Sequence, residues 1–257
     1  PEVQEGPASA LQEFYFGALA MGRLAETFGS HSMFDVSLRA EPGRRKSSVL
    51  CIRNLVPAPH LAPRFASAQV AVLFQAALAH LGGLDILVNN AGVAGPTALL
   101  EDMNFADWRR CLAVNLDSCF LCARAAAPIL RRQGSGSIVN MSSTGGQYGF
   151  ARRAPYAAAK WAIRGLTRTL AQELGPDNVR VNCICPGSVS GERIDRVIAA
   201  EAAKTGQSEA AVREGLTAIS SLRTLISPED IANTILFLTS AAGARISGQD
   251  ITVDGHT

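Results

Sequence analysis

The chain has 257 residues, of which 47% are hydrophobic and 18% are charged, and its formal net charge is +2. These values are typical of a globular protein and exclude a disordered chain. The small net charge gives no reason to expect nucleic acid or an anionic membrane surface as a partner. The length suits one large domain with a substantial core.

Membrane-spanning and secretory segments are not expected in this chain. No apolar run reaches the roughly 18–20 residues that span a bilayer, and the start lacks the charged, apolar and small-residue order of a secretory signal. Six cysteines, at positions 51, 111, 119, 122, 183 and 185, do not make a dense disulfide framework at this length. Cys119 and Cys122 have a spacing seen in zinc sites, but no second Cys or His pair matches it. We therefore expect reduced, packed thiols, no metal site and a cytoplasmic location.

Residues 1–66 carry the weakest structural signals. Helix-favouring residues predict a helix over Ala8–Phe28, and apolar runs predict short strands over Ser32–Leu38 and Ser47–Ile52. Prolines at positions 57, 59 and 63 interrupt any regular element after these strands. We expect this stretch to be an atypical N-terminal segment of the same domain as residues 67–257.

From Ser67 onward, helical and strand patterns alternate. The expected helices are Ser67–Leu81, Trp108–Leu130, Tyr156–Leu174, residues 192–216 and a helix that is capped at Ser227 and runs to Thr239. The expected strands are Leu84–Val88, Ser137–Met141, Val179–Cys185 and Ile251–Val253. Gly206 and the many charges of residues 192–216 are typical of a mobile lid over a site. This alternation predicts an α/β fold, with a mostly parallel sheet and helices on both faces.

The most informative stretch is Ser142–Gly146, followed by Tyr156 and Lys160. Tyr156 and Lys160 are four residues apart in an alanine-rich helical segment, so their side chains lie on one face. A lysine ammonium beside a phenol lowers its pKa from about 10, which allows proton transfer near neutral pH. Ser143 follows an apolar strand, at the sheet edge where ligands bind in parallel sheets. Alone, however, a Tyr-x-x-x-Lys spacing is also common on solvated helix faces.

Several further motifs accompany this pair from about Ser67 to Thr257, and together they make the chain resemble a short-chain dehydrogenase/reductase. The serine of that family precedes its tyrosine by thirteen residues, which selects Ser143 rather than Ser142. The remaining matches, in chain order, are Asn-Asn-Ala-Gly at 89–92, Asn115 in a helix, Tyr156 with Lys160, Pro186-Gly187 after a strand, Ser247-Gly248-Gln249 and Asp254-Gly255. The fold that the resemblance implies is a Rossmann-like, doubly wound sheet that forms a catalytic domain over residues 67–257.

The resemblance also implies a role for each matched catalytic residue. Tyr156 is implied as the general acid/base, and Ser143 as the residue that orients the substrate oxygen. Lys160 is implied to lower the pKa of Tyr156 and to bind the nicotinamide ribose. Asn115 is implied to hold a water molecule that links Lys160 to solvent. The implied reaction is hydride transfer between a nicotinamide cofactor and a secondary alcohol or ketone.

The implied cofactor is NAD or NADP, and the sequence does not indicate which. Residues on two loops would contact it: Asn90, Ala91 and Gly92 on the adenosine side, and Pro186, Gly187 and Val189 around the nicotinamide. Similar proteins are mostly tetramers or dimers joined through the long helices that here carry Asn115 and Tyr156. The implied partners are therefore a small alcohol or ketone and further copies of the chain.

One part of the family pattern is missing. The family opens with a strand and a Thr-Gly-x-x-x-Gly-x-Gly turn whose backbone N–H groups hold the pyrophosphate. In residues 1–66, glycines stand only at positions 6, 17, 22, 29 and 43, which does not match this spacing. Either these residues are not native family sequence, through truncation, a frame error or a substituted exon, or the chain is a variant that has lost dinucleotide binding. A non-catalytic binding or scaffold protein is therefore the alternative function, and a lyase or isomerase using the same Tyr and Lys is a third.

Two arginines, Arg152 and Arg153, lie just before Tyr156 in the loop that borders the substrate cleft of similar proteins. One interpretation is that one of them holds an anionic substrate. The other is that both lie in a solvated loop.

Overall fold

The computed structural model describes residues 32–39, 47–54 and 67–257. The helix expected over Ala8–Phe28 lies outside these ranges. The described strands form one sheet in which their spatial order follows the chain, with bounds β1 Ser32–Arg39, β2 Ser47–Asn54, β3 Ile86–Asn89, β4 Gly136–Met141, β5 Val179–Pro186 and β6 Asp250–Val253. β1 pairs with β2 in the antiparallel sense, and every later neighbour is parallel. The predicted α/β fold with a mostly parallel sheet is confirmed.

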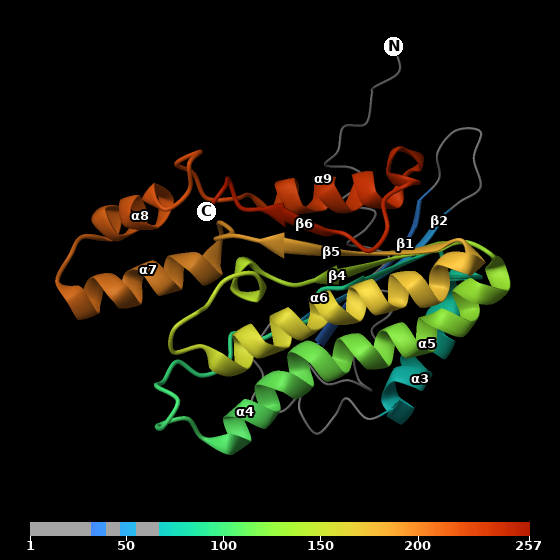
Figure 1. The fold of residues 1–257 in the computed structure, drawn as a ribbon, viewed down its shortest axis with the longest axis horizontal. Coiled ribbons are helices and arrows are strands. Elements are labelled where there is room, and N and C mark those ends of the chain that lie inside the picture. The colour runs from blue at the N-terminus through green and yellow to red at the C-terminus, as the bar shows by residue number, and fades with distance from the viewer. Residues whose placement is uncertain (1–31, 40–46, 55–66) are drawn as a thin grey trace, which may run out of the picture.

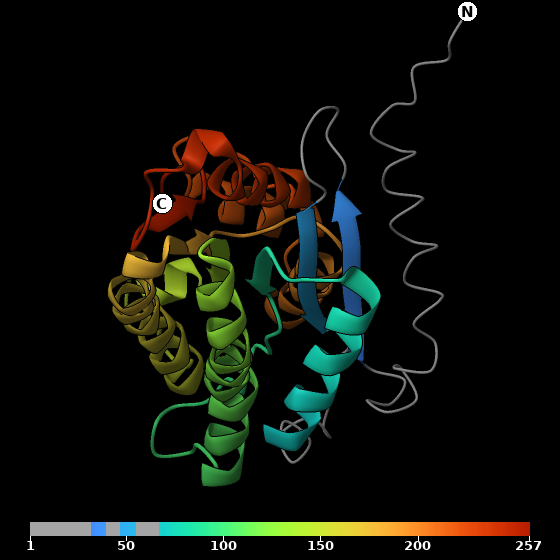
Figure 2. The ribbon, with the colours of Figure 1, turned by 90° about the vertical axis from the view of Figure 1, so that its right-hand side faces the viewer.

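Helices cover both faces of this sheet (Figures 1 and 2). Their bounds are α3 Ser67–Leu81, α4 Phe105–Leu112, α5 Ser118–Gln133, α6 Ala154–Leu174, α7 Glu192–Thr205, α8 Glu209–Ala218 and α9 Pro228–Thr239. α3, α5 and α6 pack on one face, and α9 packs on the other. α7 and α8 lie beyond the end of the sheet at which β5 ends (Figure 1). Gly206 separates these two helices in the left-handed conformation, with φ of 72°.

The local sequence explains where two of these helices begin or end. The Ser227 hydroxyl accepts from the Asp230 backbone N–H while the Asp230 carboxylate accepts from the Ser227 N–H, and Pro228 occupies the first turn. This capping box satisfies N–H groups that the start of a helix leaves free. α5 ends at Gly134, whose φ of 65° is a conformation that glycine adopts without steric cost.

The long helix expected over Trp108–Leu130 is interrupted. α4 and α5 are joined by a π-helical turn, Ala113–Asp117, which contains Asn115. A π-turn inserts one residue into the helical register, and such turns are frequent at functional sites. The sequence prediction of one continuous helix missed this turn, because the residues on both sides of it are helical.

The whole helical stretch 105–133 is long and apolar enough to cross a membrane, by length and composition. Charged residues, among them Asp117 and Arg124, interrupt this stretch, so it contains no apolar run of roughly 18–20 residues. Of its most apolar window, 39% is buried inside the protein, where α5 packs against α3, α6 and the sheet. The core helix of a globular domain meets the same test, so this stretch is weak evidence for a membrane span.

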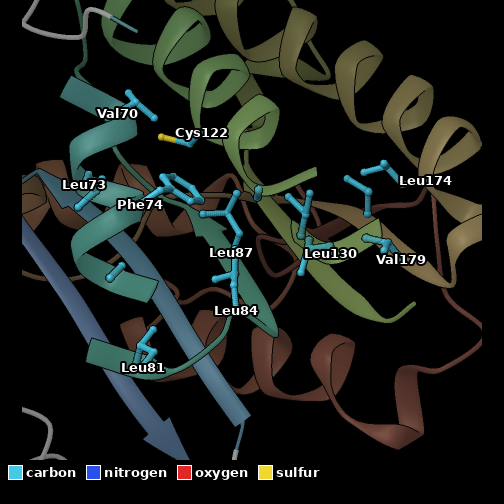
Figure 3. Close-up of a cluster of buried hydrophobic side chains, with 14 residues drawn as sticks. Val70, Leu73, Phe74, Leu81, Leu84, Leu87, Cys122, Leu130, Leu174 and Val179 are labelled. Atoms are coloured by element: carbon cyan, nitrogen blue, oxygen red, sulfur yellow. The ribbon is translucent and has the colours of Figure 1, made fainter. Parts of the chain in front are cut away.

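The core has two layers because side chains on a strand alternate between the two sheet faces. On β4, Ile138 points to the face covered by α3, α5 and α6, whereas Val139 and Met141 point to the face covered by α9. Figure 3 shows the first layer, where side chains from α3, α5, β3 and β5 converge. Each fully buried aliphatic side chain contributes about 1.5–3 kcal/mol. The side chains of β4 and β5 are therefore buried on both faces of the sheet.

The five cysteines whose side chains are described are free and buried, as expected: Cys111, Cys119, Cys122, Cys183 and Cys185. Burial raises the pKa values of the Cys119 and Cys122 thiols to about 12, so both are neutral. Among the described residues, no group of three or more His, Cys, Asp or Glu side chains is arranged to hold a metal ion.

Candidate active site

Tyr156 and Lys160 lie in the first two turns of α6, and Pro155 is the second residue of this helix. Proline is favourable there because the first turn of a helix has N–H groups without helical partners. Lys160 Nζ lies 5.6 Å from the centre of the Tyr156 ring and donates to the Met141 carbonyl over 2.9 Å. Tyr156 is 9% exposed and Lys160 is 5% exposed. A buried ammonium ion this close to a phenol favours the phenolate form.

The two serines after β4 have different surroundings. The Ser142 hydroxyl is buried and donates to the Lys160 carbonyl over 2.7 Å, which ties the end of β4 to α6. Ser143 is half-buried, and its hydroxyl oxygen accepts from the Gly145 N–H over 3.1 Å. A Cβ atom at Gly145 would lie 3.3 Å from Tyr156 Cε1, so this turn packs against the tyrosine ring. Among the described residues, the Ser143 hydroxyl donates no hydrogen bond, so Ser143 is the serine whose proton remains available.

Asn115 brings a third element to the same place. Its side-chain amide donates to the Cys111 and Val93 carbonyls over 2.9 and 3.0 Å, while its Oδ1 is buried and accepts no hydrogen bond from the described residues. A Cβ atom at Gly92 would lie 2.8 Å from Asn115 Oδ1 and 3.5 Å from Lys160 Nζ. Glycine at this position therefore leaves a small polar space open between Asn115 and Lys160.

Cys111 is a neighbour that sequence reasoning did not identify. Its Sγ lies 3.4 Å from the Asn115 amide nitrogen, and burial raises the pKa of the thiol despite nearby Lys160 and Arg153. It is therefore a neutral packing group rather than a nucleophile. Its spacing of four residues before Asn115 is the signal that would have indicated a shared helix face.

The residues expected to contact a cofactor follow β3 and β5 at the same edge of the sheet. Asn90 is exposed, and Ala91 and Gly92 are half-buried. Gly187 lies so close to Asp254 that a Cβ atom there would come within 2.7 Å of the Asp254 Cβ. Pro186 and Val189 are half-buried, and Val189 forms an isolated parallel β-bridge with Ile226. Since parallel strands end together at one edge, both loops border one site.

These surroundings fit the nicotinamide half of a dinucleotide. The buried Tyr156 phenol and Lys160 ammonium offer polar groups to the nicotinamide ribose, whereas the small space beside Gly92, which a single Cβ atom would fill, suits a water molecule between Lys160 and Asn115 Oδ1. The pyrophosphate half has no comparable support in the described residues, because no glycine-rich turn occurs beside β2 there. In the sequence, residues 55–66 contain three prolines and no glycine, and proline offers no N–H to a phosphate.

A family model described as enoyl-(acyl carrier protein) reductase matches residues 66–255 of this chain. That range begins just before α3 and includes every site residue described above. The chain belongs to the short-chain dehydrogenase/reductase family. The match leaves out the same N-terminal residues in which the glycine-rich turn is missing.

Similar members of this family act on hydroxyl compounds. The trans-4-hydroxycyclohexanecarboxylate dehydrogenase of Sinomonas cyclohexanicum is 39% identical over 180 residues, which is 70% of this chain and 62% of that protein. The 3alpha-hydroxysteroid dehydrogenase of Mediterraneibacter gnavus is 36% identical over 208 residues, 79% of this chain and 78% of that protein. The crystal structure of an NAD+-bound xylitol dehydrogenase is similar with a TM-score of 0.68 and 27% identity, over 73% of this chain and 74% of that one. These comparisons support an NAD(P)-dependent oxidoreductase that acts on alcohols or ketones.

Proposed function

We propose that this chain transfers a hydride between a nicotinamide dinucleotide and a secondary alcohol or ketone, with Tyr156 as the general acid/base. The observation that carries the proposal is the convergence of Asn115, Ser143, Tyr156 and Lys160 at one sheet edge from three different segments of the chain. Such a set provides a proton acceptor, a hydrogen-bond donor for the substrate oxygen and a cation in one place.

In the oxidation direction, the Tyr156 phenolate takes the proton of the substrate hydroxyl. Ser143 donates a hydrogen bond to the same oxygen and fixes its position. Lys160 stabilises the phenolate by its charge, and its bond to the Met141 carbonyl keeps the ammonium in place. The proton then leaves through the polar space between Lys160 and Asn115 Oδ1, where a water molecule has two polar partners.

The dinucleotide, when bound, supplies the nicotinamide ring that accepts or donates the hydride. The chain's own contribution is to bind and orient it. Lys160 and Tyr156 would contact the nicotinamide ribose, and the loops after β3 and β5 would flank the two ends of the cofactor. The residues proposed for this contact are Asn90, Ala91, Gly92, Pro186, Gly187 and Val189.

A ring-borne secondary alcohol is the substrate class we favour. Two relatives are named for hydroxylated cyclohexane and steroid substrates. In this chain Phe150 is 48% exposed, and its ring packs edge-on against Tyr156 with centroids 6.3 Å apart. A half-exposed aromatic side chain packed against the proposed proton donor favours an apolar ring on the substrate.

We also propose that the chain forms a homodimer or homotetramer in the cytoplasm. Large apolar side chains lie exposed on the helices that carry the site: Phe105 on α4, Phe120 on α5 and Trp161 on α6. Exposed apolar side chains on neighbouring long helices favour association with a second copy.

The buried free thiols suit a reducing compartment. Pairing of β2 with β3 supports one domain that includes part of residues 1–66.

The test is turnover by the purified chain. It is incubated with NAD+ or NADP+ and trans-4-hydroxycyclohexanecarboxylate or a 3-hydroxysteroid, and absorbance of the reduced nicotinamide is followed. We expect reduction of one cofactor, which is lost in the Tyr156→Phe variant. Cofactor binding without turnover of any secondary alcohol would favour the scaffold alternative, and product formation without net cofactor change would favour a lyase or isomerase.

A further inference from the structure

Arg153 is not a solvated loop residue. It is half-buried at the start of α6, and its guanidinium donates to the Thr97 hydroxyl over 3.0 Å and to the Ala94 carbonyl over 2.9 Å. Thr97 and Ala94 lie in the loop that follows Gly92. The neighbouring Arg152, in contrast, is exposed and has a φ of 63°.

The same guanidinium lies over the catalytic tyrosine. Its central carbon is 5.5 Å from the centre of the Tyr156 ring and 5.5 Å from the centre of the Phe150 ring. A cation above an aromatic face is attracted to the ring, and the attraction increases when the ring becomes a phenolate. Lys160 lies at 5.6 Å from the same ring, so the Tyr156 ring has two cations close to it.

We propose that Arg153 is a positioning residue for the reaction, which locks the loop after β3 to α6 and provides a second cation that stabilises the Tyr156 phenolate. This inference rests on the proposed role of Tyr156. Among the described residues, the charged side chains that face this ring are Arg153, the residue just before α6, and Lys160 on α6, and the neutral Cys111 thiol on α4 lies near both charges. Both charged groups favour the phenolate, and the thiol adds no charge.

The geometry also explains why arginine suits this position. Two hydrogen bonds from a planar fork hold the guanidinium in a fixed orientation, whereas a lysine ammonium would act as a point charge. Both partners belong to a segment more than fifty residues away in the sequence. Arg153 therefore couples the loop proposed to contact the cofactor to the helix that carries the proton donor. An anionic substrate would compete for donors that are already engaged.

The test is a direct titration of Tyr156, which needs no turnover. The chain has three tyrosines, so the difference in phenolate absorbance between the parent chain and Tyr156→Phe isolates the Tyr156 signal. In Arg153→Gln we expect the titration midpoint to rise by about one pH unit, because one of two nearby cations is lost. Arg153→Lys keeps the charge and should remain closer to the parent midpoint. Arg152→Gln, the matched control, should titrate as the parent does.

Arg153→Met replaces Arg153→Gln if the glutamine variant loses the circular dichroism spectrum of the parent. An unchanged midpoint in the neutral variants, an equal rise in Arg152→Gln, or a rise in Arg153→Lys as large as in the neutral variants would overturn the proposal. If the parent chain shows no turnover but the midpoint still moves as expected, the proposed function fails, whereas the stabilisation of the Tyr156 phenolate by Arg153 stands. If the parent chain turns over substrate but the Tyr156 midpoint does not move in the Arg153 variants, the proposed function stands and the proposal for Arg153 fails.

Discussion

The β3–β5 side and the β1–β2 side of the described sheet differ in the segments that follow their strands. At β3, β4 and β5, each strand ends in a segment that we place at the site, and hydrogen bonds tie the segments after β3 and β4 to α6 or to Arg153 just before it. On the β1–β2 side of the sheet, β1 is antiparallel to β2, and β2 is followed in the sequence by prolines rather than glycines. Proton transfer and phosphate binding are thus separable properties of this fold. In this chain we propose a complete set of proton-transfer residues, whereas the described residues include no glycine-rich turn beside β2.

This difference has a physical origin. The proposed proton-transfer residues depend on buried contacts between β3, β4 and α6, where Asn89, Asn140 and Thr167 form a continuous chain of buried hydrogen bonds. Such a network is costly to disrupt, because each broken bond leaves a buried polar group unpaired. A phosphate-binding turn depends instead on backbone N–H groups in one short loop, which a local sequence change can remove.

The largest effect should come from Tyr156→Phe. Loss of the phenol removes the proton acceptor while keeping the ring that packs against Gly145 and Phe150. We expect kcat to fall by about 10³-fold or more, within the range for a lost general acid/base. Steady-state turnover of a secondary alcohol measures this, with Tyr148→Phe, which removes the hydroxyl of an exposed tyrosine, as the control. Comparable losses in both variants would contradict the role of Tyr156.

A smaller loss is expected for Lys160→Gln. Without this ammonium the phenolate is less stable, so the pKa of Tyr156 rises and the pH profile of oxidation moves to higher pH. At neutral pH we expect kcat to fall by about 10²-fold, with partial recovery in alkaline buffer. Arg132→Gln removes one exposed positive charge elsewhere and serves as the control. A pH profile that keeps its position in Lys160→Gln would show that Lys160 does not act on Tyr156.

Gly92→Ala tests the space between Asn115 and Lys160. Its Cβ atom would come within 2.8 Å of Asn115 Oδ1, so neighbouring groups must shift. We expect about 1–3 kcal/mol of lost stability from overpacking, measured by urea unfolding, and about a tenfold loss of kcat. Gly149→Ala, where a Cβ atom meets nothing within 4 Å, is the matched control. Equal stability of both variants would mean that the space between Asn115 and Lys160 accommodates an added methyl group without cost.

Much of this structure could be predicted from the sequence. Helix α3 has the predicted bounds, and the capped start of α9 follows from Ser227, Pro228 and Asp230. These features depend on local spacing and capping chemistry. The π-turn at Asn115 and the contacts of Arg153 were not predicted. Both depend on tertiary packing, since the partners of Arg153 are 56 and 59 residues away and apolar periodicity does not reveal them.

The most direct test of the difference between the two sides of the sheet compares the dissociation constants of NAD+ and nicotinamide mononucleotide. The mononucleotide contains the half of the cofactor that the site fits, and it lacks the pyrophosphate and adenosine. If no glycine-rich cradle holds the pyrophosphate, calorimetric titration should give dissociation constants within about tenfold of each other, or about 1.4 kcal/mol. Binding of NAD+ that is several hundredfold tighter would contradict this account, because it would require a strong pyrophosphate site.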